Sequence, residues 1–124
     1  MSADNVLFQH YSEFPKSEWR WPNFQPVEVA CRGTGQLMVD FHSMDCLQAL
    51  RDKLDAPIYL NSAFRSEFWN KKVGGAAKSQ HLKAQAFDCR MQNHDPHQFE
   101  AAARECEFSS FGYYVDQMFM HIDT

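Results

Sequence analysis

The chain has 124 residues, of which 44% are hydrophobic and 15% aromatic, and its formal net charge is −4. This length and apolar content suffice for one globular domain, and the negative charge gives no attraction to nucleic acid. No apolar run approaches the roughly 20 residues that a membrane-spanning helix requires. We therefore expect a single domain over residues 1–124. It should be a monomer with a small or peptide-like partner, and it should bind neither nucleic acid nor a membrane.

The first residues and the cysteines bear on the compartment. The start, Met1-Ser2-Ala3-Asp4-Asn5, lacks the basic region and apolar stretch of a signal peptide, which predicts synthesis in the cytoplasm. The four cysteines form no C-x-x-C pair. Reduced, buried thiols are the favoured interpretation, because a free cysteine packs as a small hydrophobe. The alternatives are disulfides, whose pairing the sequence alone cannot sort, and a cysteine zinc site.

Residues 1–26 read as an irregular arm. Frequent prolines, at positions 15, 22 and 26, oppose a regular helix there. The aromatic side chains of the arm should pack across the body of the domain; the alternative is that they form a wall of a substrate groove. They are Phe8, Tyr11, Phe14, Trp19, Trp21 and Phe24.

The middle of the chain shows one clear helix. Residues 31–35 read as a turn, after which Ser43 suits a helix N-cap, with leucines recurring at helical spacing up to about Lys53. Residues 57–61 read as a short strand. Residues 62–72 then predict a turn into a short helix that ends at Gly74-Gly75.

The last third of the chain predicts a helix between two strands. Asp95-Pro96 is a strong helix start, and the helix should run to about Cys106. Residues 112–114 read as the end of a connection, and Asp116-Gln117 as a turn. Apolar residues alternate with others in 86–91 and in 118–123, as in half-buried strands.

The alternation places Asp88 and His121 away from the core. Side chains alternate across a strand, so each residue should lie on the face opposite to its apolar neighbours. Together with His81 they form a set of two imidazoles and one carboxylate, which is typical of a catalytic zinc site with one open position. Ligands of one ion lie within roughly 4 Å of each other. A straight helix would separate residues 81 and 88 by roughly 10 Å, so we expect a bend followed by a strand.

The sequence resembles the zinc D-alanyl-D-alanine carboxypeptidase family over roughly residues 20–123. The most specific segment is S-x-H-x-x-x-x-A-x-D at 79–88, followed by His121-Ile122-Asp123. Weaker segments are the runs at 24–35 and 47–52, Asn61-Ser62-x-Phe64-Arg65-Ser66, Asn70-x-x-Val73-Gly74-Gly75-Ala76 and Gly112-Tyr113-Tyr114.

The resemblance implies an α+β fold in which a small antiparallel sheet carries zinc and helices pack on one side. It implies one zinc ion held by His81, Asp88 and His121, with Arg65 and Ser79 binding the substrate. The implied substrate is a peptidoglycan peptide, cleaved next to D-alanine by a carboxypeptidase or an endolysin-type endopeptidase, and a phage lysin would be released to the cell wall. The alternative is a non-catalytic zinc-binding module of the same fold, which would bind wall peptides or a protein.

The chain departs from the family pattern at two positions. Many relatives carry an acidic base three residues before the last zinc histidine, and here that residue is Met118. Asp123 and Asp116 are the candidates to replace it, although Asp123 could instead orient His121 and Asp116 could simply form the turn. Ala84 stands where the motif usually has glycine.

Overall fold

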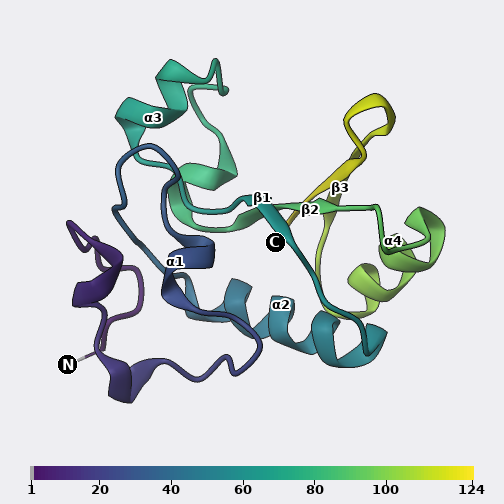
Figure 1. Cartoon of the computed structure of the whole chain (residues 1–124), viewed down its shortest axis with the longest axis horizontal. Helices are drawn as coiled ribbons and strands as arrows, with labels where there is room; N and C mark the ends of the chain where they lie inside the picture. Colours follow the sequence, from purple (N-terminus) through teal and green to yellow (C-terminus); the bar gives the residue numbers. More distant parts are fainter. Residues whose placement is uncertain (1) are drawn as a thin grey trace.

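The computed structural model describes residues 2–124 and shows an antiparallel sheet with helices around it (Figure 1). In these residues four strands pair in the order β1-β2-β4-β3. The strands are β1 (Leu60–Ser62), β2 (Ala86–Arg90), β3 (Ser110–Tyr114) and β4 (Phe119–Asp123). The helices are α1 (Pro26–Val29), α2 (Phe41–Leu54), α3 (Glu67–Lys72) and α4 (Pro96–Glu105). Short 3-10 turns are η1 (Tyr11–Glu13), η2 (Lys16–Glu18), η3 (Gln80–Lys83) and η4 (Val115–Gln117).

The main core lies between one face of the sheet and the two longest helices. Figure 1 shows α2 and α4 on the same side of the strands, with the short α3 standing apart from them. The alternating apolar residues of β2 and β4 are almost completely buried in this core, together with leucines of α2 and Phe99 of α4. Burial of one such side chain stabilises the fold by about 1.5–3 kcal/mol. The α+β class and the strand alternation expected from the sequence are thereby confirmed.

The N-terminal arm packs as expected. Phe14, Trp21 and Phe24 are buried, and Trp19 meets Trp21 edge to face at 4.9 Å between ring centroids. The indole N–H of Trp21 donates to Asp45 on α2, which ties the arm to the long helix. These aromatic side chains belong to the core rather than to the metal pocket described below.

The N-cap predicted for α2 was wrong. The cap lies three residues earlier, at Asp40, whose side chain accepts a hydrogen bond from the backbone N–H of Ser43, and the helix begins at Phe41. Ser43 lies inside the helix and is buried. The cap predicted for α4 is confirmed, since Asp95 accepts from the backbone N–H of Gln98 and Pro96 occupies the first turn.

Two strand predictions also need correction. The strand expected at 57–61 is shifted to Leu60–Ser62. Residues 112–114 do not end a connection but belong to β3, which pairs with β4 at the edge of the sheet. The four cysteines are free thiols, as favoured from the sequence; Cys31, Cys46 and Cys89 are buried as expected, whereas Cys106 is only half-buried. Within residues 2–124, no helix has the length and apolar character that a membrane crossing needs.

Candidate metal centre

The strand register brings one row of residues together across the sheet. Asp88 on β2 lies directly opposite His121 on β4, with Ser62 of β1 on one side and Gly112 of β3 on the other. Residues directly opposite in antiparallel strands point to the same face and their side chains touch. The Asp88 carboxylate Oδ1 accordingly lies 3.0 Å from Nδ1 of His121.

His81 reaches the same carboxylate from the η3 turn that precedes β2. Ser79 caps this turn, and the chain then bends into the strand at Ala84, whose backbone is left-handed with φ 59°. The bend places Nε2 of His81 3.2 Å from Oδ1 of Asp88. The expectation of a bend followed by a strand is confirmed. The left-handed backbone also explains why the family motif that the sequence resembles usually has glycine where this chain has Ala84, because a side chain disfavours this conformation.

The three side chains form a compact group of possible metal ligands. One donor atom from each of His81, Asp88 and His121 lies within 4.8 Å of the others. Ligands at about 2.0–2.2 Å from one tetrahedral ion are about 3.3–3.6 Å apart, so the group needs little rearrangement to close on an ion. His81 and Asp88 are buried, whereas His121 is half-buried and faces the opening.

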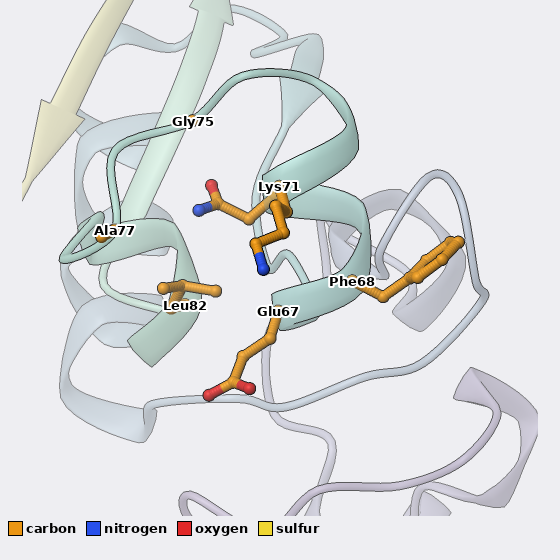
Figure 2. A pocket seen from close by; sticks show the side chains of 7 residues that line it. Glu67, Phe68, Lys71, Gly75, Ala77 and Leu82 are labelled. Carbon is orange, nitrogen blue, oxygen red and sulfur yellow. The ribbon is translucent and has the colours of Figure 1, made fainter.

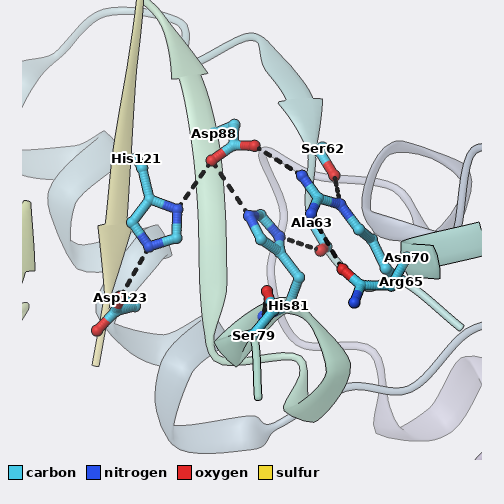
Figure 3. A network of polar contacts seen from close by, with 9 residues as sticks. All are labelled: Ser62, Ala63, Arg65, Asn70, Ser79, His81, Asp88, His121 and Asp123. Atoms are coloured by element: carbon cyan, nitrogen blue, oxygen red, sulfur yellow. Dashed lines mark hydrogen bonds and ion pairs between the residues drawn. The ribbon is translucent and has the colours of Figure 1, made fainter. Parts of the chain in front are cut away.

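A hydrogen bond on the far side of each imidazole ring determines which of its nitrogens carries the proton and which has its lone pair toward the group (Figure 3). Nδ1 of His81 lies 2.6 Å from the Ala63 carbonyl oxygen, which can only accept, so Nδ1 carries a proton. Nε2 of His121 lies 2.7 Å from Oδ2 of Asp123. When both rings are neutral, two nitrogen lone pairs and a carboxylate oxygen therefore face one another. Such an arrangement requires a cation between them or protons on the rings.

The carboxylate of Asp88, at the centre of the group, stays ionised because its neighbours lower its pKa. Burial alone would raise the pKa of Asp88, but when the rings carry protons on the nitrogens that face it, hydrogen bonds from His121 and His81 outweigh burial and lower the pKa of Asp88 to about 2. The hydrogen bond to Asp88 raises the pKa of His121 above its ordinary value of 6.5; burial opposes this shift and Asp123 adds to it. A metal ion must therefore displace a proton from His121 below that raised pKa.

Arg65 is anchored beside the group by its side chain. Its guanidinium donates to Oδ2 of Asp88 at 3.3 Å, to Ser62 at 3.1 Å and to Asn70 at 3.2 Å. Gly75 permits this packing, because a Cβ at that position would lie 2.0 Å from the Asn70 side-chain oxygen. The contact between Arg65 and Asp88 leaves Oδ1 of the carboxylate free to face the two imidazoles.

A pocket of 360 Å³ opens above this group. The structure places both predicted substrate-binding residues, Arg65 and Ser79, in its lining. It also brings the three predicted ligands, the loop at 73–76, Tyr114 and Phe119 to the same pocket. Ser79 accepts a hydrogen bond from the backbone N–H of His81, so its hydroxyl proton remains available to a bound molecule.

The two candidate bases lie in different places. Asp123 contacts His121 on the side of the ring that faces away from Asp88. Asp116 lies in η4 at the tip of the β3–β4 hairpin, where it lines a separate hollow with Tyr114, Val115 and Gln117. Among the described residues, the lining of the metal pocket includes neither aspartate. Their catalytic roles stay predictions.

Several residues contribute to the site in ways that the sequence did not predict. The Ala63 carbonyl has no sequence signal, because any residue supplies one. Asn70 and Ser62 stood in segments that resemble the family, yet only the structure shows that both hold Arg65. Tyr114 stacks on Phe119 with ring centroids 4.6 Å apart, which builds one wall of the pocket. This pairing depends on β3, a strand that was not predicted from the sequence.

A larger hollow of 560 Å³ lies between α3 and η3 (Figure 2). Its polar lining includes Glu67 and Lys71 but, within the described chain, no imidazole or thiol; Phe68 and Leu82 make much of it apolar. Size alone does not identify a reactive site, and this hollow lacks a set of metal donors. We therefore place the candidate site at the smaller pocket.

Comparison with known proteins bears directly on this centre. A family model described as Peptidase M15 matches residues 22–123, a range that contains all three possible ligands, Arg65 and Ser79. No curated protein matches the chain.

Proposed function

The chain belongs to the peptidase M15 family, and from that premise we propose that it is a zinc peptidase acting on peptidoglycan. His81, Asp88 and His121 would hold one zinc ion, and the substrate would be a wall peptide cleaved at a bond next to D-alanine. The observation that carries the proposal is the convergence of two oriented imidazoles and a buried carboxylate at the floor of an open pocket. A peptidoglycan peptide is the partner that we propose, bound by a monomer.

Zinc in such a site lowers the pKa of a bound water to about 7 and polarises a carbonyl group. The chain's own residues would hold the ion on one side only. Both imidazoles and Asp88 come from the floor of the pocket, where strands β2 and β4 and the η3 turn fix them. The side toward solvent stays open, which is the arrangement that catalysis requires and a structural metal site lacks.

Arg65 suits the role of a substrate clamp. Three of its N–H groups donate to protein acceptors, which fixes the plane of the guanidinium. An arginine has five N–H donors, so two remain without a partner in the described chain. These could bind the terminal carboxylate of a peptide or the oxygen on which negative charge develops. Ser79 would donate its hydroxyl proton to the same substrate.

Hydrolysis also needs a group that takes a proton from water and passes it to the leaving amine. We propose that one of the two aspartates, Asp116 or Asp123, serves this purpose. Asp116 lies on the hairpin that also carries Tyr114 of the pocket wall. Asp123 lies next to His121. Substitution of each by alanine, assayed at saturating zinc, separates the two assignments, because the base variant stays inactive however much zinc is present.

A second candidate function is a zinc-binding module that binds wall peptides or a protein without cleaving anything. Met118 favours it, because this thioether occupies the position of the usual acidic base and cannot accept a proton. Met118 is also 43% exposed rather than buried in a packed site.

The deciding experiment is to incubate zinc-loaded protein with defined muropeptides that end in D-alanyl-D-alanine, and to follow the products by mass spectrometry. Our proposal predicts loss of one D-alanine or cleavage of a cross-link, and no product with His81→Ala. Release of free D-alanine identifies a carboxypeptidase, whereas separation of cross-linked dimers identifies an endopeptidase. Binding of the muropeptides without any product would contradict the peptidase and support the binding module.

A further inference from the structure

We infer that Asp123 is a positioning residue that holds the His121 ring so that Nδ1 faces the metal. The inference requires only that a metal ion binds at this site, and it does not depend on the substrate or on peptidase activity. It decides between the two roles that the sequence left open for this aspartate.

The contacts of His121 define its orientation from both ends of the ring. Nε2 lies 2.7 Å from Oδ2 of Asp123, and Nδ1 lies 3.0 Å from Oδ1 of Asp88. Because a carboxylate can only accept, the proton of a neutral His121 belongs on Nε2, which leaves the lone pair on Nδ1. A half-turn of the ring would put a carbon toward Asp88 and would break the bond to Asp123.

The backbone makes Asp123 a firm support. Asp123 follows His121 by two residues on β4, so both side chains lie on the same face of the strand. β4 is an inner strand, and Asp123 pairs with Ala86 on β2 and with Ser110 on β3. Its side chain is only 14% exposed. A carboxylate on a backbone fixed from both sides, with little exposed surface, restricts the imidazole that it contacts.

The two imidazoles differ in what orients them. His81 is oriented by the backbone carbonyl of Ala63, which no substitution of that side chain removes. His121 is oriented by a side chain, so its orientation depends on the identity of residue 123. Partners of this kind on metal-binding histidines typically change metal affinity 10–100-fold when they are removed.

The same contacts argue against Asp123 as the base. A general base must come within about 2.6–3.2 Å of the proton that it takes, or reach it through one water. Oδ2 of Asp123 is occupied by the N–H of His121, on the side of the ring that faces away from Asp88. Of the two candidate bases this leaves Asp116, which lines a separate hollow at the hairpin tip rather than the metal pocket.

The first test is the zinc affinity of Asp123→Ala, measured by competition with a chelator. We expect zinc to bind about 10–100-fold more weakly than to the unaltered protein. The matched control is Glu100→Ala, which also removes one carboxylate but from an exposed ion pair with Arg104 on α4. Its zinc affinity should not change. Equal affinity of Asp123→Ala and the unaltered protein would overturn the inference.

The second test needs no substitution and therefore does not depend on the folding of a variant. In the zinc-loaded protein, ¹H–¹⁵N correlation spectra of the histidine rings should show His121 with zinc on Nδ1 and a slowly exchanging proton on Nε2. His81 should show the opposite assignment. Zinc on Nε2 of His121, or rapid exchange of its Nε2 proton, would contradict the assigned role.

A third readout separates positioning from proton transfer. If the protein turns over muropeptides, excess zinc should restore the activity of Asp123→Ala, because the loss lies in metal binding. Activity that stays lost at saturating zinc would assign Asp123 as the base and overturn the inference. If the unaltered protein has no activity, the proposed function fails, while zinc affinity and the ring spectra still decide the role of Asp123.

Discussion

The two faces of the β2–β4 strand pair carry out different tasks with neighbouring residues. On one face Phe87, Cys89, Met120 and Ile122 are buried in the core, each no more than 2% exposed. On the other face Asp88, His121 and Asp123 form a polar network. Within residues 2–124, no buried side-chain nitrogen or oxygen lacks a hydrogen-bond partner.

The difference between the faces teaches that stability and metal binding are separable along this strand pair. Burial makes the core face inert; for example, it raises the pKa of the Cys89 thiol well above the ordinary range. The same sheet holds its reactive groups one residue further along each strand. A substitution should therefore affect one property or the other according to the face on which it lies.

The largest effect that we expect is loss of metal binding in His121→Ala. A carboxylate and a single imidazole remain, and three protein ligands are the minimum found in catalytic zinc sites. Isothermal titration with zinc should show no binding in the micromolar range, while the circular dichroism spectrum stays native. Undiminished zinc binding would show that His121 is not a ligand.

The adjacent residue provides the opposite case. Ile122→Ala should lower the free energy of unfolding by about 2–5 kcal/mol, because it leaves a cavity in the core. Urea denaturation of the metal-free protein measures this change. The variant should still bind one zinc ion under conditions in which it is folded. Loss of zinc binding by the folded variant would mean that the two faces are coupled.

Acidification should weaken metal binding before it affects the core. The pKa of His121 is raised, chiefly by its hydrogen bond to Asp88, so protons compete with the metal below that pKa. Zinc affinity should be highest above the raised pKa and fall by up to about tenfold per pH unit below it. Titrations between pH 8 and pH 6 measure the slope. An affinity that is independent of pH in this window would contradict the assignment of His121.

The smallest expected effect concerns an exposed polar residue outside the β2–β4 strand pair. Asp95→Ala removes the N-cap of α4 and should lower the free energy of unfolding by about 1 kcal/mol. Its zinc affinity should equal that of the unaltered protein. A change in zinc affinity would show that the metal site responds to general destabilisation, which would weaken the separation argued above.

The sequence predicted much of the site because the alternation in β2 and β4 carries two kinds of information. The apolar positions, such as Phe87 and Ile122, indicate the face that packs in the core. The residues that alternate with them, Asp88 and His121, are thereby placed on the opposite face. His81 joined them as the third member of a zinc-type ligand set, and the resemblance supplied Arg65 and Ser79. The N-cap of α4 could be predicted because Asp95 and Pro96 form a local pattern that needs no tertiary contact.

Other features depended on information that local patterns lack. β3 lies at the sheet edge with both faces partly exposed, so its residues show no alternation of burial. Without β3, the pairing of Tyr114 with Phe119 could not be foreseen. The Ala63 carbonyl and the contacts of Arg65 depend on how distant segments pack. The cap at Asp40 competed with Ser43, and both residue types suit that position.

X-ray absorption at the zinc edge of the loaded protein tests the central claim most directly. The account predicts one zinc ion per chain, with two imidazoles in its coordination shell and all ligand atoms at about 2.0–2.2 Å. Sulfur ligands at about 2.3 Å would instead point to the cysteines. That result, or a protein that retains no zinc, would contradict a metal centre built from His81, Asp88 and His121.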